Sequence, residues 1–157
     1  MSFLIRKSEP QDVVAIMQLI HELALFEKAP NEVVANEQTL LDAGFSENPV
    51  FISWVAVQHN HIVGMAICYV RYSTWKGPVL YLEDLIVTES CRGQGIGKAL
   101  FETCLDHARS KQYRRMVWQV LDWNTNAIEF YKKYKVKFDS GWIRIVKDRK
   151  STRLNSS

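Results

Sequence analysis

A glycine-rich segment in the second half of the sequence has the spacing of a phosphate-binding loop. Residues 92–97 read Arg-Gly-Gln-Gly-Ile-Gly and follow an apolar stretch that ends at Val87. Glycine lets the backbone approach a ligand, and the first N–H groups of a helix attract phosphate because they have no acceptor within the helix. A Walker A loop would need Gly at Arg92 and Ser or Thr at Ala99, and a dinucleotide fingerprint would need a small residue at Leu100. An anion site of another kind is therefore predicted.

Two adjacent carboxylates, Glu83 and Asp84, precede this loop on the same apolar stretch. They could bind a cation, or take a proton from an alkyl ammonium, whose pKa is about 10.4. Neighbouring side chains of a regular strand point to opposite faces, so both reach one site only where the strand is bulged. An exposed pair on a strand edge is the alternative. His59 and His61 lack acidic or cysteine neighbours and favour a solvated turn over a metal site.

Hydrophobic periodicity predicts the elements that must position these residues. Strands are expected over residues 3–6, 50–58, 62–71, 79–87 and 115–120, with a hairpin turn at 59–61. Helices are expected from a capping box at Ser8-x-x-Gln11 to Ala29, over 32–43 with Gly44 as the left-handed end, over 97–112 and over 125–134. The glycine loop thus stands where a strand passes into a helix.

Composition limits the class of protein. The chain has 157 residues, 47% hydrophobic, and a formal charge of +3. Residues 148–157 contribute +2 of this, and the remaining +1 argues against a nucleic-acid or membrane partner. No apolar run approaches the roughly 20 residues of a bilayer span, and the first residues lack a signal-peptide core, so a cytoplasmic protein is expected. Cys68, Cys91 and Cys104 lack zinc or disulfide spacing and are expected to be reduced.

The last ten residues differ from the rest of the sequence. Residues 148–157 have neither apolar periodicity nor an amphipathic pattern, and they resemble the translation of a sequencing-library adapter. We expect a single domain over 1–147 followed by a disordered tail that is not native. A genuine polar terminus is the alternative.

Two motifs in order carry a family resemblance. The pattern Arg-x-x-Gly-x-Gly of residues 92–97 resembles the coenzyme A pyrophosphate loop of the GNAT acetyltransferase superfamily. Further on, Asn-x-x-Ala-x-x-Phe-Tyr from Asn124 to Tyr131 resembles that superfamily's closing motif. Leu80-Tyr-Leu-Glu-Asp, His21-Glu-Leu-Ala, Leu40-Leu-Asp-Ala-Gly-Phe, Asp122-Trp-Asn and Gly141-Trp look like the diamine (spermidine/spermine) N-acetyltransferase branch. Lys135, where the family has glycine, and Phe26, where some members have tyrosine, depart from the pattern.

The resemblance implies a fold and a reaction. The fold would be α/β, with a mixed twisted sheet of six to seven strands, splayed between the fourth and fifth strands and flanked by about four helices. The reaction would move an acetyl group from acetyl-CoA, without a metal, to the amine of a small cationic substrate, and the protein would be a homodimer. Acetylation of protein lysines, and a GNAT module that binds acyl-CoA without turnover, remain as alternatives.

The resemblance also implies roles for individual residues. Glu83 would be the base, acting through water, and Tyr131 the acid that protonates the departing thiolate. Backbone N–H groups around 85–87 would stabilise the oxyanion if a bulge splays the strand. The expected cofactor contacts are Leu85, Ile86, Val87, Arg92, Gly93, Gln94, Gly95, Ile96, Gly97, Lys98, Asn124, Asn126, Ala127 and Tyr131. The expected substrate contacts are Phe26, Glu27, Glu83, Asp84 and Trp118.

Overall fold

The computed structural model describes residues 2–149, and the chain divides into two compact units. The first unit runs to Leu121 and the second begins at Asp122. The tail expected over 148–157 lies, from residue 150 onward, outside the described residues. The first unit contains the sheet and three of the α-helices of the described chain.

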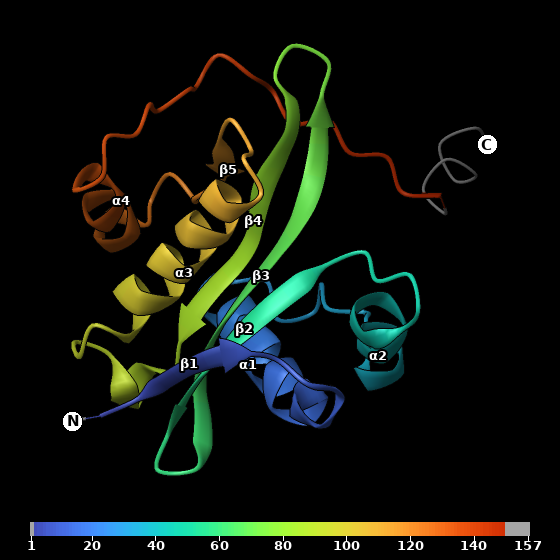
Figure 1. Cartoon of the computed structure of the whole chain (residues 1–157), viewed down its shortest axis with the longest axis vertical. Helices are drawn as coiled ribbons and strands as arrows, with labels where there is room; N and C mark the ends of the chain where they lie inside the picture. Colours follow the sequence, from blue (N-terminus) through green and yellow to red (C-terminus); the bar gives the residue numbers. More distant parts are fainter. Residues whose placement is uncertain (1, 150–157) are drawn as a thin grey trace. The chain divides into compact units, whose positions relative to one another are not determined.

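Five strands of the described residues form one sheet in the order β1-β2-β3-β4-β5 (Figure 1). Their bounds are Leu4–Lys7 (β1), Ile52–Gln58 (β2), His61–Ser73 (β3), Gly77–Val87 (β4) and Met116–Trp118 (β5). The first four pair antiparallel, and β5 runs parallel to β4. The mixed α/β sheet is confirmed, as is the opening between the fourth and fifth strands, because their pairing stops at the Leu82–Trp118 pair.

The strand count is lower than the six to seven expected. In the described residues no strand follows β5, and residues 133–148, beyond the fourth helix, form none. The side chains of Trp142, Ile143 and Ile145 in that segment are 81%, 87% and 89% exposed. Without apolar burial, little offsets the entropy lost when a strand is ordered.

Four α-helices occur in the described residues, as predicted: α1 (Val13–Phe26), α2 (Glu37–Phe45), α3 (Ile96–Ser110) and α4 (Thr125–Lys132). Short 3-10 turns precede α1 at Pro10–Asp12 and α3 at Glu89–Cys91. The capping box before α1 is one residue later than predicted and uses Glu9 and Asp12. The Ser8 hydroxyl hydrogen-bonds to Ser53 on β2 and therefore does not cap the helix. Asp12 also forms an ion pair with Arg6, with an N–O distance of 2.7 Å.

Three boundaries were wrong for local reasons. Helix α2 begins five residues late because the Asn36 side chain caps it, accepting a hydrogen bond from Thr39 N at 2.9 Å. Gly44 lies inside α2 rather than after it, and the Phe51 ring occupies the place where its Cβ would stand. The hairpin turn has two residues, His59 and Asn60, both with positive φ, and the next residue already belongs to β3.

The two faces of the sheet pack against different helices. Helices α1 and α2, blue and teal in Figure 1, cover the face that carries Met65, Ile67 and Ile86. The remaining members of that apolar cluster are Val13, Ile16, Met17, Leu19, Leu40 and Val55. Helix α3 covers the other face, where the Sγ atoms of Cys68 and Cys104 are 3.5 Å apart. Because paired residues of β3 and β4 share a face, the pairing shows whether a side chain faces α1 and α2 or faces α3.

Candidate functional site

A β-bulge lies at Glu83, the residue predicted to be the base. Asp84 pairs with Ile67 of β3, but the next pair toward the hairpin is Leu82 with Cys68, so Glu83 is the extra residue. Because Ile67 faces α1 and α2, Asp84 faces them too. Glu83 interacts with the phenol of Tyr69, two residues from Ile67 and on the same face. The bulge therefore turns both carboxylates toward one side of the sheet.

Three carboxylates lie close enough to repel one another. Burial, followed by the negative charges of Glu83 and Glu27, raises the pKa of Asp84 from 3.8 to about 6. Partial burial, followed by the charge of Glu83, also raises the pKa of Glu27, which follows the last residue of α1. We call Glu27, Glu83 and Asp84 the acidic group. A bound cation would relieve its repulsion, so its electrostatics suit an ammonium.

Replacing Asp84 by Asn is expected to make stability less dependent on pH. A carboxyl whose pKa is higher in the folded than in the unfolded chain destabilises the fold fully above pH 6 and not at all below pH 3.8. At about 1.4 kcal/mol per tenfold change in proton affinity, the upper limit is about 3 kcal/mol. Melting temperatures should therefore favour Asp84→Asn more at pH 8 than at pH 4. Asp42→Asn, at an exposed position of α2, is the control for the loss of a carboxylate, and parallel pH profiles for Asp84→Asn and the wild type would contradict the assignment.

Aromatic and basic side chains beside the acidic group had no signal in the sequence. The rings of Tyr69 and Tyr81 are 5.2 Å apart across β3 and β4, and the Arg71 guanidinium lies 5.6 Å from the centroid of the Tyr81 ring. Burial and then the charge of Glu83 raise the pKa of Tyr69. The alternation of side chains along a strand could have placed each residue on one face. Only the pairing of β3 with β4 shows that these residues lie near Glu83.

The glycine loop has a backbone suited to an anion. Gly93 and Gly95 have φ of 81° and 84°, and a Cβ at either position would meet nothing within 4 Å. Helix α3 begins directly after Gly95, so the N–H groups of Ile96, Gly97 and Lys98 belong to its first turn. The open space before the glycines and these donors suit a phosphate group.

Two predicted cofactor residues use their side chains elsewhere. Gln94 accepts a hydrogen bond from Gln58 Nε2 at 2.8 Å and donates to the carbonyl of Cys91 at 3.2 Å, which fastens the loop to β2. The Ile96 side chain is 1% exposed and belongs to the core. Both residues can therefore offer only their backbone to a ligand in front of the loop.

The end of β4 has an open edge on the side of β5. Only Leu80, Tyr81 and Leu82 pair with β5 in the described structure, whereas β4 continues to Val87. Gly64 of β3 pairs with Val87 on the other edge and lies so close that a Cβ there would be 3.0 Å from the Ile86 carbonyl oxygen. The residues predicted at 85–87 therefore lie on a strand that is held from one edge only.

The Phe26 ring, expected at the substrate, contacts Arg92 at the entrance to the glycine loop. Its ring centroid lies 5.6 Å from the guanidinium carbon of Arg92, whose Nε donates to the carbonyl of Val87 at 2.9 Å. Trp118, also expected at the substrate, packs against Phe101 of α3 with ring centroids 5.2 Å apart. Its pairing with Leu82 puts it on the face opposite Asp84, because the bulge reverses the side-chain alternation between Leu82 and Asp84.

In the second unit, the closing motif forms the first two turns of α4. The Asn124 side chain accepts a hydrogen bond from Ala127 N at 3.3 Å and so caps the helix. Tyr131 is 8% exposed and its ring packs against Phe130 at 5.3 Å. Asn124, Ala127 and Tyr131 are three and four residues apart and share one face of the helix, whereas Asn126 is exposed.

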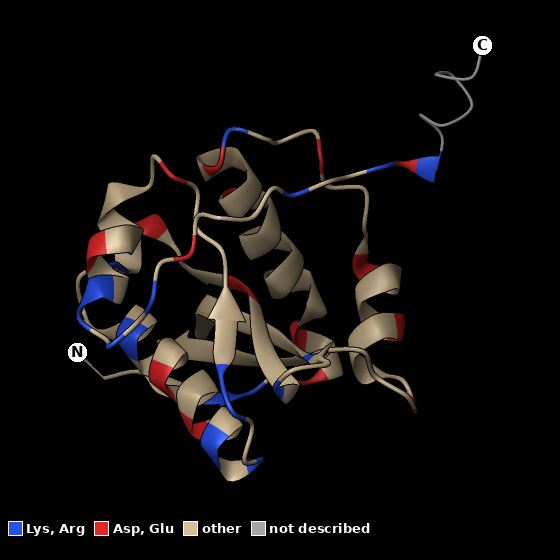
Figure 2. Ribbon diagram, turned by 90° about the horizontal axis from the view of Figure 1, so that it is seen from above, with Lys and Arg blue, Asp and Glu red and all other residues tan. Residues whose placement is uncertain are grey.

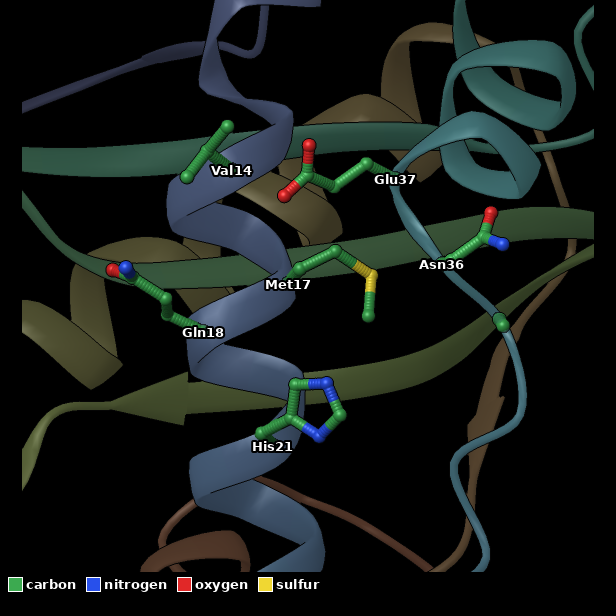
Figure 3. A pocket seen from close by; sticks show the side chains of 7 residues that line it. Val14, Met17, Gln18, His21, Asn36 and Glu37 are labelled. Carbon is green, nitrogen blue, oxygen red and sulfur yellow. The ribbon is translucent and has the colours of Figure 1, made fainter.

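A hollow of about 240 Å³ lies between α1 and α2 in the first unit (Figure 3). It is lined by Val14, Met17, Gln18, His21, Ala35, Asn36 and Glu37, none of which was predicted in a site.

Over residues 2–149, no three His, Cys, Asp or Glu side chains are arranged to hold a metal ion. Within the same range, none of the helices has the length and apolarity of a membrane span. Basic and acidic segments are interspersed along the ribbon in Figure 2.

Comparison with known proteins agrees with this geometry. Residues 16–135 match the model of the Acetyltransferase (GNAT) family. Thialysine N-epsilon-acetyltransferase of Mus musculus is 39% identical over 136 residues, covering 82% of this chain and 80% of that protein. Spermidine/spermine N(1)-acetyltransferase-like protein 1 of Homo sapiens is 35% identical over 136 residues, which cover 82% of this chain and 20% of that longer protein.

Solved structures show the same fold. The structure of AAC(6')-Iy in complex with a bisubstrate analogue, CoA-S-monomethyl-acetylneamine, superposes with a TM-score of 0.73 at 18% identity and covers 95% of this chain and 99% of that one. At this identity the likeness concerns the fold alone. Taken with the family match over 16–135 and the relatives above 30% identity, it shows that the chain belongs to the acetyltransferase (GNAT) family and is an N-acetyltransferase.

Proposed function

We propose that the protein transfers the acetyl group of acetyl-CoA to a primary amine of a small substrate with at least two cationic groups, such as a diamine, a polyamine or thialysine. The observation that carries the proposal is the acidic group at the bulged end of β4, on the strand that leads directly into the glycine loop. The relatives named for thialysine and for spermidine/spermine support this substrate class.

Coenzyme A would be held by backbone groups of the glycine loop and by the family motif of α4. Gly93, Gly95 and the first turn of α3 would receive the pyrophosphate, where the open space and the N–H donors suit it. The family resemblance gives Asn124, Asn126 and Ala127 contacts with the pantetheine arm. Acetyl-CoA, when bound, supplies an acetyl group activated as a thioester.

The acidic group would bind and deprotonate the amine. Asp84 and Glu27 would hold the cationic substrate by charge, and the exposed Glu83 would take the proton of the reacting ammonium through a water molecule. The neutral nitrogen would then attack the acetyl carbon. Backbone N–H groups around residues 85–87, on the part of β4 that extends beyond β5, would donate to the developing oxyanion.

Tyr131 would provide the proton that the leaving sulfur needs. A phenol with a reference pKa of about 10 can protonate a thiolate as the carbon–sulfur bond breaks. The motif position carries this assignment, since Tyr131 stands seven residues after Asn124 on the same face of α4. The nitrogen of the intermediate then loses its second proton, which restores the Tyr131 phenol, so the ammonium and acetyl-CoA give the amide, free coenzyme A and the one proton taken by Glu83.

Cation recognition is tested by comparing cadaverine with n-pentylamine, which has the same chain length and one amine fewer. A charge-assisted contact contributes about 1.5–3 kcal/mol, so kcat/KM for cadaverine should be at least about tenfold higher. Asp84→Asn should reduce this ratio, whereas the control Asp42→Asn should preserve it. Equal kcat/KM for both amines in the wild-type protein would contradict recognition of a second cation.

A further inference from the structure

Glu22 of α1 is bonded to the segment that enters the glycine loop. One carboxylate oxygen accepts a hydrogen bond from the Thr88 hydroxyl at 2.7 Å, and the other accepts from Glu89 N at 3.2 Å. The same second oxygen lies 3.9 Å from Nη2 of Arg92. We call Glu22, Thr88, Glu89 and Arg92 the Glu22 network. It joins residues that are 66 to 70 positions apart in the sequence.

Phe26 extends this network by one helical turn. Glu22 and Phe26 are four residues apart and lie on the same face of α1. The Phe26 ring lies beneath the Arg92 guanidinium, and Arg92 Nε bonds back to the end of β4 at Val87. The Arg92 side chain is therefore held by the Phe26 ring and by the hydrogen bond of its Nε. Arg92 immediately precedes Gly93 of the glycine loop.

We propose that Glu22 is a positioning residue for the coenzyme A loop. It would hold residues 88–92 in the conformation that presents Gly93, Gly95 and the first turn of α3 to the pyrophosphate. The inference rests on the proposed function, because it takes the glycine loop as the pyrophosphate site. Helix α1 ends at Phe26, just before Glu27 of the acidic group, so one helix would support both the cofactor loop and the amine site.

The hydrogen bonds and the charge of Glu22 have opposite effects on an anion at the loop. The bonds to Thr88 and Glu89 order the loop and favour binding, whereas a carboxylate 3.9 Å from Arg92 repels the pyrophosphate and competes for the guanidinium. Arg92 and Glu22 side chains are 43% and 34% exposed, which makes their ion pair weak. Charge-assisted hydrogen bonds are stronger, so ordering should dominate.

The test is calorimetric binding of coenzyme A, without the acetyl group, to Glu22→Gln, Thr88→Val and the double variant. Each single variant should bind about tenfold more weakly, and the double variant no more weakly than the weaker single one, because the Thr88 hydroxyl acts only through the hydrogen bond to Glu22 that Glu22→Gln already weakens. Thr88→Ser retains the hydroxyl and should bind like wild type. His21→Gln, on the same helix but outside the network, controls for general effects on α1.

Kinetics separate positioning from a general loss of structure. The KM for acetyl-CoA should rise in Glu22→Gln, while kcat and the KM for the amine stay unchanged. Unchanged or tighter coenzyme A binding by Glu22→Gln, or additive losses in the double variant, would overturn the role of Glu22. Failure of the wild-type protein itself to bind coenzyme A would instead overturn the proposed function, and the role of Glu22 with it.

Discussion

Tyr131→Phe is expected to lower kcat at least about a hundredfold while changing coenzyme A affinity by less than about twofold. A positioned general acid contributes about 10²–10⁴ to the rate, and phenylalanine cannot donate a proton. Tyr131 is 8% exposed and packs on Phe130, and phenylalanine preserves that apolar contact. Steady-state turnover and calorimetric binding of coenzyme A measure the two effects separately.

Tyr134→Phe is the matched control for this prediction. Tyr134 stands three residues after Tyr131 and also lies near the Phe130 ring, with centroids 5.8 Å apart. It lacks the motif position, so its turnover should match that of the wild type. Equal losses in the two variants would assign both tyrosines to packing and would remove Tyr131 from the chemistry.

Glu83→Gln is expected to lower kcat/KM for the amine about a hundredfold at pH 7. The amide cannot accept the proton of an ammonium whose pKa is about 10.4, so the reaction must wait for the small neutral fraction of the amine. As the pH rises toward 10 this fraction grows and the loss should shrink. The decisive measurement is the ratio of wild-type to variant kcat/KM as a function of pH.

Glu47→Gln, a substitution at an exposed position outside the acidic group, is the control for the loss of a carboxylate. It should leave kcat/KM unchanged at every pH. A ratio for Glu83→Gln that stays constant from pH 7 to 10 would indicate that Glu83 only binds the substrate by charge. That result would require another base.

The strand, glycine loop and helix around residues 92–97 were predictable because the information for them is local. Arg92, Gly93 and Gly95 follow one another, and the apolar stripe of α3 begins immediately after them, so the spacing alone indicates a strand, a loop and a helix N-terminus. The same holds for Asn124 and Tyr131, whose spacing matches the turns of one helix. Patterns of this kind can be recognised in a single sequence because they depend only on neighbouring residues.

The acidic group was only partly predictable because it depends on pairing between strands. The sequence shows that Glu83 and Asp84 are adjacent, and that a bulge would be needed to turn both to one face. The position of the bulge follows from the register of Ile67 and Cys68 against β4, which one sequence does not contain. Tyr69 enters the site through the same register.

Contacts between distant elements were missed. The contact of Phe26 with Arg92 was not predicted, and Glu22 was not singled out although it accepts hydrogen bonds from Thr88 and Glu89. Both follow from where α1 crosses the end of β4. The start of α2 was missed for a simpler reason. The Asn36 side chain caps the helix and so fixes its first residue at Glu37, although the pattern of residues 32–36 also suggested a helix.

The most direct measurement is release of free thiol from acetyl-CoA in the presence of putrescine, spermidine, spermine, thialysine, lysine or a lysine-containing peptide. Acetyl transfer to a small cation predicts turnover with at least one of the diamine, polyamine or thialysine acceptors, at a rate that Tyr131→Phe lowers at least about a hundredfold. Turnover with the peptide alone, or none with any amine by a protein that binds acetyl-CoA, would contradict the proposed function.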